Sequence, residues 1–178
     1  MIYDKNSIIT ALQEAFGQVA TLIEEAEAAD LEKNRPEKWC ASDHFRHLIL
    51  SAKPVVGSLK MSQEDLLKIC QPENPSRSYD QLVLDYEAML VKRNGKTTAT
   101  YEPVHLRDAS VAELSTSWKI LLQKAIDRLE YWSEERLEIN GLPHPAIGVL
   151  TMREMLYFTI LHTRRHHQLM MQTMTISV

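Results

Sequence analysis

The segment TMREMLYFTILHTRRHHQLMMQT, residues 151–173, decides how this chain folds. Thr151 and Glu154 fit a capping box, in which each residue's side chain bonds the other's backbone N–H at the start of a helix. The side chains that share one face of the following helix recur every three or four residues: Met155, Phe158, Thr159, His162, His166, Leu169 and Thr173. This period predicts an amphipathic helix to about Thr173 whose mainly apolar face points into a core.

Two helices are predicted in the first sixty residues. Apolar residues repeat at helical spacing from 8 to 26, and either Asn6 or Ser7 can cap this segment. A second helix is expected to begin after a Ser42 cap and to carry its own apolar stripe. Pro54 lies within that stripe and is expected to kink the helix or to end its first half early.

The middle of the chain adds two more helices. One is predicted over residues 79–92, and the stretch 94–109, which has no clear periodicity, is interpreted as a surface crossover. Ser110 and Glu113 form a second capping box, which begins a long helix. Because no strand alternation of useful length is found, we predict an all-α chain: a bundle of four long helices with extra short ones, forming one domain over residues 1–178.

The composition argues against several kinds of partner. A net charge of −4 disfavours a nucleic-acid-binding surface, and the five glycines form no phosphate-binding loop. The longest mostly apolar stretch, residues 155–161, is too short to span a bilayer, and polar residues occupy the N-terminus where a signal peptide needs an apolar run. Cys40 and Cys70 match no CxxC spacing. We therefore expect a cytoplasmic protein that binds neither nucleic acid nor membrane.

The histidines provide the main indication of function. Five of the seven lie in two segments, residues 42–47 and 161–167. His162 and His166 are four positions apart and so lie about 40° from each other on the core-facing side of the last helix. His47 borders the apolar stripe of the second helix. If these helices pack together, the three imidazoles can converge on one point, as in metal sites inside helical bundles.

Three neutral imidazoles suit zinc, nickel, iron or copper better than magnesium or calcium. Such a set leaves coordination positions open, as a catalytic metal requires, and the metal could lower the pKa of a bound water or thiol. Each ligand is expected to donate its other ring N–H to a nearby group, for which the candidates are Ser51, Asp43, Thr159 and Tyr157. The remaining histidines considered are expected at the surface or beside the ligands: His44, His105 and His167.

A second interpretation is that these are core histidines satisfied by ordinary hydrogen bonds. The residues alone leave both interpretations open. The zinc-protease motif HExxH is not matched, because Thr163 stands where that motif has its general base.

Two motifs resemble those of the DinB-like (YfiT-like) superfamily. WxxS at 39–42 leading into HLIxS at 47–51 resembles the motif of its second helix. HPxxGxLTxxE at 144–154 leading into HxxxHHQL at 162–169 resembles the motif of its last helix. The order and separation of the motifs agree with the family over nearly the whole chain.

This resemblance implies a four-helix bundle with a long crossover, often a homodimer. It implies a divalent metal, commonly nickel or zinc, held at the motif positions His47, His162 and His166. The family includes transferases that use the low-molecular-weight thiols bacillithiol or mycothiol, a mycothiol-dependent isomerase, and members without known activity. It does not imply a particular substrate.

The function expected is therefore that of a metal-dependent enzyme activating a thiol or water toward a small electrophile, of the thiol transferase or hydrolase type. The alternatives are a non-catalytic stress module that binds a small molecule or metal, and a structural protein with vestigial histidines. The sequence assigns no role to His44, His144 or His167.

Overall fold

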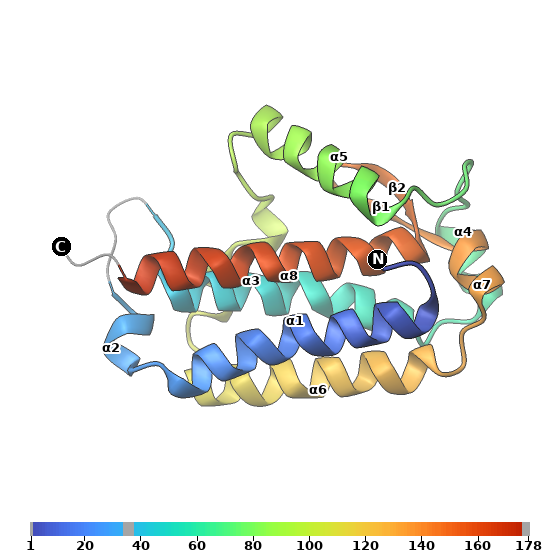
Figure 1. Ribbon diagram of the computed structural model, residues 1–178. Helices are drawn as coiled ribbons and strands as arrows, with labels where there is room; N and C mark the ends of the chain where they lie inside the picture. The colour runs from blue at the N-terminus through green and yellow to red at the C-terminus, as the bar shows by residue number, and fades with distance from the viewer. Residues whose placement is uncertain (1, 34–37, 176–178) are drawn as a thin grey trace.

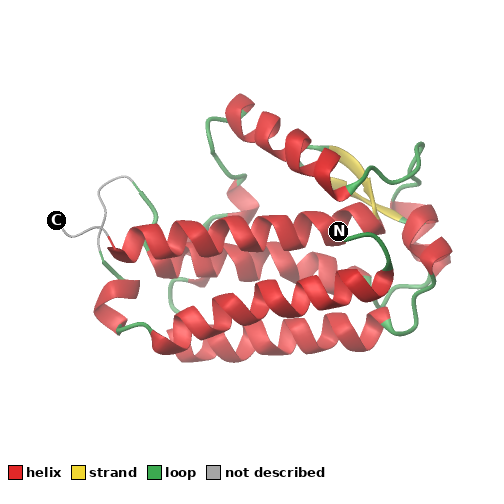
Figure 2. Ribbon diagram, viewed as in Figure 1, coloured by secondary structure: helices red, strands yellow, loops and turns green. Residues whose placement is uncertain are grey.

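The computed structural model describes residues 2–33 and 38–175, and it confirms the all-α prediction (Figure 1, Figure 2). Four long helices lie side by side: α1 (Lys5–Glu25), α3 (Ala41–Ser58), α6 (Val111–Leu129) and α8 (Met152–Thr175). Both α1 and α3 pack against α6 and α8. The early and late histidine segments therefore belong to neighbouring helices.

Shorter elements surround this bundle. They are α2 (Ala28–Leu31), α4 (Gln63–Ile69), α5 (Tyr79–Lys92), the 3-10 helices η1 (Ala99–Tyr101) and η2 (Pro103–Leu106), α7 (Glu134–Ile139), and strands β1 (Gly141–His144) and β2 (Gly148–Thr151). The connection from α3 to α6 is long and contains α4, α5 and both 3-10 helices. Within it, α5 packs on the outer side of α8, away from the rest of the bundle (Figure 1).

The core lies between the four long helices. Trp118 of α6 is 1% exposed, and its ring stacks on Phe16 of α1 at a centroid distance of 3.9 Å. The Trp118 indole N–H donates to the Phe16 carbonyl oxygen at 3.0 Å, so the one polar atom of this large side chain is satisfied inside the core. Phe45 of α3 meets the same indole edge-on. These rings join three of the four helices.

The capping predictions were right for two helices and wrong for two others. Both predicted boxes are confirmed, at the start of α6 and around Thr151 and Glu154. The cap of α1 is Asp4, with Ser7 as its partner in a capping box, so neither Asn6 nor Ser7 is the cap. The cap of α3 lies two residues earlier than predicted, at Cys40 and not at Ser42.

Helix α3 differs from its prediction at its N-terminus. Its N-cap is Cys40 and not Ser42, because Asp43 accepts the Cys40 N–H at 3.3 Å. The Ser42 hydroxyl instead accepts from Arg46 at 2.6 Å. Pro54 does not end the helix, which continues to Ser58. Buried side chains on both sides of the proline hold this part of α3 against the core.

A short β-hairpin is the main departure from the sequence prediction, which contained no strand. Strands β1 and β2 pair antiparallel, with Gly141 opposite Thr151 and His144 opposite Gly148. Four-residue strands are too short to show the period-two alternation that identifies strands. A Cβ at Gly141 would lie 2.7 Å from the Leu150 carbonyl oxygen, so this close pairing requires glycine.

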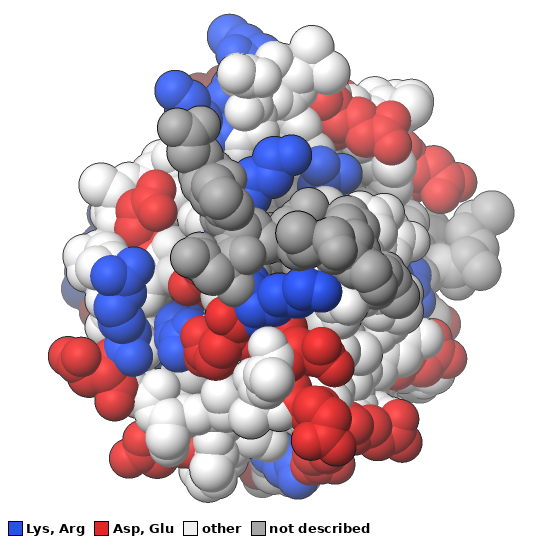
Figure 3. Space-filling view, turned by 90° about the vertical axis from the view of Figure 1, so that its left-hand side faces the viewer, with Lys and Arg blue, Asp and Glu red and all other residues white. Residues whose placement is uncertain are grey.

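The surface carries charges of both signs. At the end of the molecule shown in Figure 3, Lys and Arg side chains lie among Asp and Glu, which predominate toward the lower edge. Over residues 2–33 and 38–175, no helix combines the length and apolar character needed to cross a membrane.

Candidate metal centre

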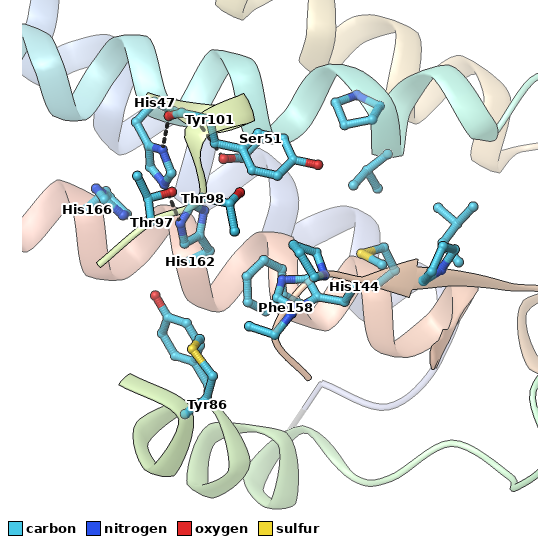
Figure 4. Close-up of a pocket in the computed structure, with 18 of the residues that line it drawn as sticks. His47, Ser51, Tyr86, Thr97, Thr98, Tyr101, His144, Phe158, His162 and His166 are labelled. Atoms are coloured by element: carbon cyan, nitrogen blue, oxygen red, sulfur yellow. Dashed lines mark hydrogen bonds between the residues drawn. The ribbon is translucent and has the colours of Figure 1, made fainter. Parts of the chain in front are cut away.

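The structure brings together the three histidines predicted as a metal site. His47 extends from α3, and His162 and His166 extend from successive turns of α8 (Figure 4). One ring nitrogen from each lies within 4.8 Å of the others. All three side chains are buried, with exposed fractions of 5%, 7% and 6%.

The orientation of His47 is set by a backbone carbonyl. Its Nδ1–H donates to the Tyr101 carbonyl oxygen at 2.8 Å, since a carbonyl can only accept. In the neutral ring this leaves the lone pair on Nε2, which lies 3.1 Å from Nε2 of His162. His47 is therefore held in the tautomer that a metal ligand needs.

His44 holds His166 in a similar way. The two Nδ1 atoms lie 2.9 Å apart, so one ring donates to the other. This contact leaves Nε2 of His166 for a cation. His44 is 8% exposed and lies one turn before His47 on α3. His44 was expected either at the surface or beside the ligands, and the structure places it beside the ligands.

The orienting groups predicted from the sequence are wrong, because each of the four bonds elsewhere. Ser51 donates to the His47 carbonyl oxygen and not to its ring. Thr159 donates to the Met155 carbonyl oxygen, and Tyr157 donates to the Tyr3 carbonyl oxygen. Asp43 accepts from Cys40 at the cap of α3.

Burial keeps the three rings neutral. It lowers the pKa of His47, and it lowers the pKa values of His162 and His166 well below the usual value, with a further reduction from the neighbouring imidazoles. Neutral imidazoles carry the lone pairs that zinc and nickel bind. A divalent cation bound between the rings would accept these lone pairs, which otherwise face one another in a buried space.

The triad lies at one wall of a cavity of about 600 Å³. Aromatic and methionine side chains form part of its other walls: Trp39, Met61, Tyr86, Met89, Met155 and Phe158. The Thr98 hydroxyl, which is buried and has no hydrogen-bond partner among the described residues, also lines it. The donor set and the unsatisfied hydroxyl fit a divalent cation that faces a small molecule in the cavity.

Tyr86 places a second hydroxyl near the triad. Its ring meets that of His162 edge-on at a centroid distance of 6.3 Å, and Figure 4 shows its hydroxyl directed toward the histidines. Burial raises the pKa of Tyr86 to about 12, so the hydroxyl stays protonated and can donate a hydrogen bond.

The other histidines lie outside the triad. His105 is exposed and donates to the Ala99 carbonyl oxygen, and His167 is half-buried on α8. Arg165 is exposed beside the site, and its charge contributes to the lowered pKa values of His162 and His166. His144, the first residue of the motif at 144–154, lines the cavity.

Sequence reasoning missed Tyr101 and Thr98, both in the stretch interpreted as a surface crossover. A backbone carbonyl is present at every position, so no residue type marks Tyr101 as the partner of His47. The residue type of Thr98 does not indicate that it lines the cavity. Its position there depends on the packing of η1 against α3. Trp39, by contrast, was part of a recognised motif, and its ring lies 5.0 Å from that of His47.

Comparison with known families identifies the superfamily of this chain. The sequence profile of the DinB superfamily matches residues 11–170. The chain belongs to the DinB superfamily. No curated protein matches it. Membership of the DinB superfamily, together with the buried histidine cluster, supports a site that could hold a divalent metal and leaves the identity of the metal open.

The contact between His44 and His166 yields a prediction. In His44→Phe the ring volume is retained, but the hydrogen bond that orients His166 is lost. We expect zinc affinity to fall about 10–100-fold, the usual effect of removing a partner that orients a metal ligand. Competition titration against a chromogenic chelator, on protein without a His-tag, measures this change.

His167→Phe is the matched control, since His167 lies outside both the triad and the cavity. It should bind zinc as the wild type does. Unchanged zinc affinity in His44→Phe would show that His44 does not orient His166.

Proposed function

We propose that this DinB superfamily protein is a metal-dependent enzyme that activates a thiol or water for attack on a small electrophilic substrate. The metal is zinc or nickel, and its ligands are His47, His162 and His166. The observation that carries the proposal is that the triad faces a cavity large enough for a small molecule. A closed structural site would instead surround the cation with four protein ligands.

The chain's own residues have distinct roles in this proposal. The three histidines hold the cation, while the Tyr101 carbonyl and His44 keep the rings of His47 and His166 oriented. When bound, zinc or nickel lowers the pKa of a thiol or water and so supplies a nucleophile at neutral pH.

The cavity walls support binding of the electrophile. The rings of Trp39 and Phe158 pack near the triad and give the cavity apolar walls there. The Tyr86 and Thr98 hydroxyls can donate to an oxygen on which negative charge develops. Such donors stabilise charge more strongly inside an apolar cavity than in water.

The test is turnover by metal-loaded protein without a His-tag. Bacillithiol, mycothiol or water is combined with an epoxide, an alkyl halide and a Michael acceptor, and products are measured by mass spectrometry. We expect product with at least one pair, dependent on added zinc or nickel and lost in His162→Ala. His167→Ala, on the same helix but outside the triad, should retain the wild-type rate.

The result that would overturn the proposal is absence of conjugation or hydrolysis across the panel by fully loaded protein. If these compounds nevertheless raised the melting temperature, the non-catalytic binding module would be favoured.

A further inference from the structure

The cavity has a second polar region, separated from the triad by one aromatic ring. His144, the last residue of β1, packs against Phe158 at a centroid distance of 4.4 Å. Phe158 in turn stacks on His162 at 5.2 Å. Both His144 and Arg93, which follows α5, line the cavity (Figure 4 shows His144). A molecule bound there would lie along Phe158 with one end near each polar group.

The hairpin turn fixes which nitrogen of His144 carries the proton. Nδ1 accepts the backbone N–H groups of Ala146 at 3.2 Å and Ile147 at 3.1 Å. Burial, with a smaller contribution from the charge of Arg93, lowers the pKa of His144 to about 4. The ring is therefore neutral with its proton on Nε2, and no described residue accepts from that nitrogen.

Arg93 provides a positive charge in the same region. Its Nε donates to the Lys96 carbonyl oxygen at 3.2 Å, while its terminal nitrogens have no partner among the described residues. Lys60 and Lys96 also line the cavity, and no described aspartate or glutamate does. This is unexpected in a chain with a net charge of −4, and it favours an anionic ligand.

We propose that His144 and Arg93 bind the carboxylate of a small, otherwise apolar molecule whose other end reaches the three histidines. A carboxylate accepts from both groups at once, using the Nε2–H of His144 and the guanidinium of Arg93. The apolar walls formed by Met89, Leu90 and Met155 suit the body of such a molecule. This proposal deepens the proposed function and rests on it for the chemistry that follows binding.

Binding itself can be tested without metal. Phenylbutyrate and its neutral amide, phenylbutyramide, are titrated into chelator-treated wild-type protein, and dissociation constants are measured by NMR. Because no cation is present, the carboxylate cannot bind at the triad through a metal. We expect the acid to bind about tenfold more tightly than the amide, since hydrogen bonds to a charged group are the stronger ones.

Two variants locate the site. Arg93→Gln removes the charge, and His144→Asn removes the Nε2 donor while keeping an acceptor near the Nδ1 position for the hairpin turn. Each should weaken acid binding about tenfold and leave amide binding nearly unchanged. Lys92→Gln is the matched control, because Lys92 is exposed and outside the cavity, and it should bind the acid as the wild type does.

Equal affinity of the wild type for acid and amide would overturn the inference. So would acid binding that neither variant weakens, or that Lys92→Gln weakens as much as Arg93→Gln. None of these outcomes would contradict the proposed metal site. Conversely, if the metal-loaded protein turned over no electrophile, carboxylate binding by the metal-free protein would be unaffected.

Discussion

His162→Ala is expected to lower the affinity of the protein for zinc and nickel by at least about a hundredfold, because losing a ligand should cost more than losing a partner that orients one. His162 lies 3.1 Å from His47 through their Nε2 atoms, and its ring is 4.5 Å from that of His166 between centroids. Two remaining imidazoles hold a divalent cation weakly. Competition titration on protein without a His-tag gives the affinity, and elemental analysis gives the metal content.

The control for this loss is His167→Ala. This histidine lies next to His166 on α8 but outside the cluster that could hold an ion. It should bind one equivalent of metal as the wild type does, and circular dichroism should show that both variants keep their helices. Wild-type affinity in His162→Ala would exclude His162 as a ligand.

Glu154→Ala is expected to produce the largest loss of stability that we predict, about 2–3 kcal/mol in the free energy of unfolding, because the backbone donors that bond this carboxylate lose their acceptor. Glu154 is 3% exposed at the start of α8. One carboxylate oxygen accepts the Arg77 backbone N–H at 2.8 Å and its guanidinium at 2.6 Å. The other accepts the Thr151 N–H at 2.9 Å. Alanine would leave the two backbone N–H groups without this acceptor, while the Arg77 guanidinium would keep its bond to Asp85 at 2.7 Å.

Chemical denaturation measures this loss, and two variants help to interpret it. Glu154→Gln retains an acceptor and should lose less stability than Glu154→Ala. Glu113→Ala removes the corresponding residue of the exposed capping box on α6 and should have a much smaller effect, because water can replace the carboxylate there. Equal losses in Glu154→Ala and Glu113→Ala would show that the burial of Glu154 and its ion pair with the partly exposed Arg77 contribute little.

Local features of this chain were predictable because their causes lie within one or two helical turns. The Thr151–Glu154 box depends on residues three positions apart, and the predicted range 79–92 matches α5. The shared face of His162 and His166 follows from their spacing. Local reasoning failed at Ser42, because serine is a favoured N-cap residue and cysteine is not. Asp43 accepts the backbone N–H of Cys40, and the helix begins after Cys40 instead.

Features made by distant segments were not predictable in the same way. The orienting partner of His47 is the carbonyl of Tyr101, 54 positions away, and a carbonyl leaves no mark in the sequence. The contact of His44 with His166 spans 122 positions. The sequence placed His44 on the same side of its helix as His47, but it could not show which ring His44 would meet.

The sequence by itself therefore determined the five longer helices, their buried faces and the three histidines able to meet, since periodicity and spacing act along the chain. Only the tertiary structure decided that α3 and α8 are neighbours, that η1 supplies the carbonyl for His47, and that α5 and the hairpin enclose a cavity beside the triad. The physical reason is that packing brings together groups whose separation along the chain carries no information about their separation in space.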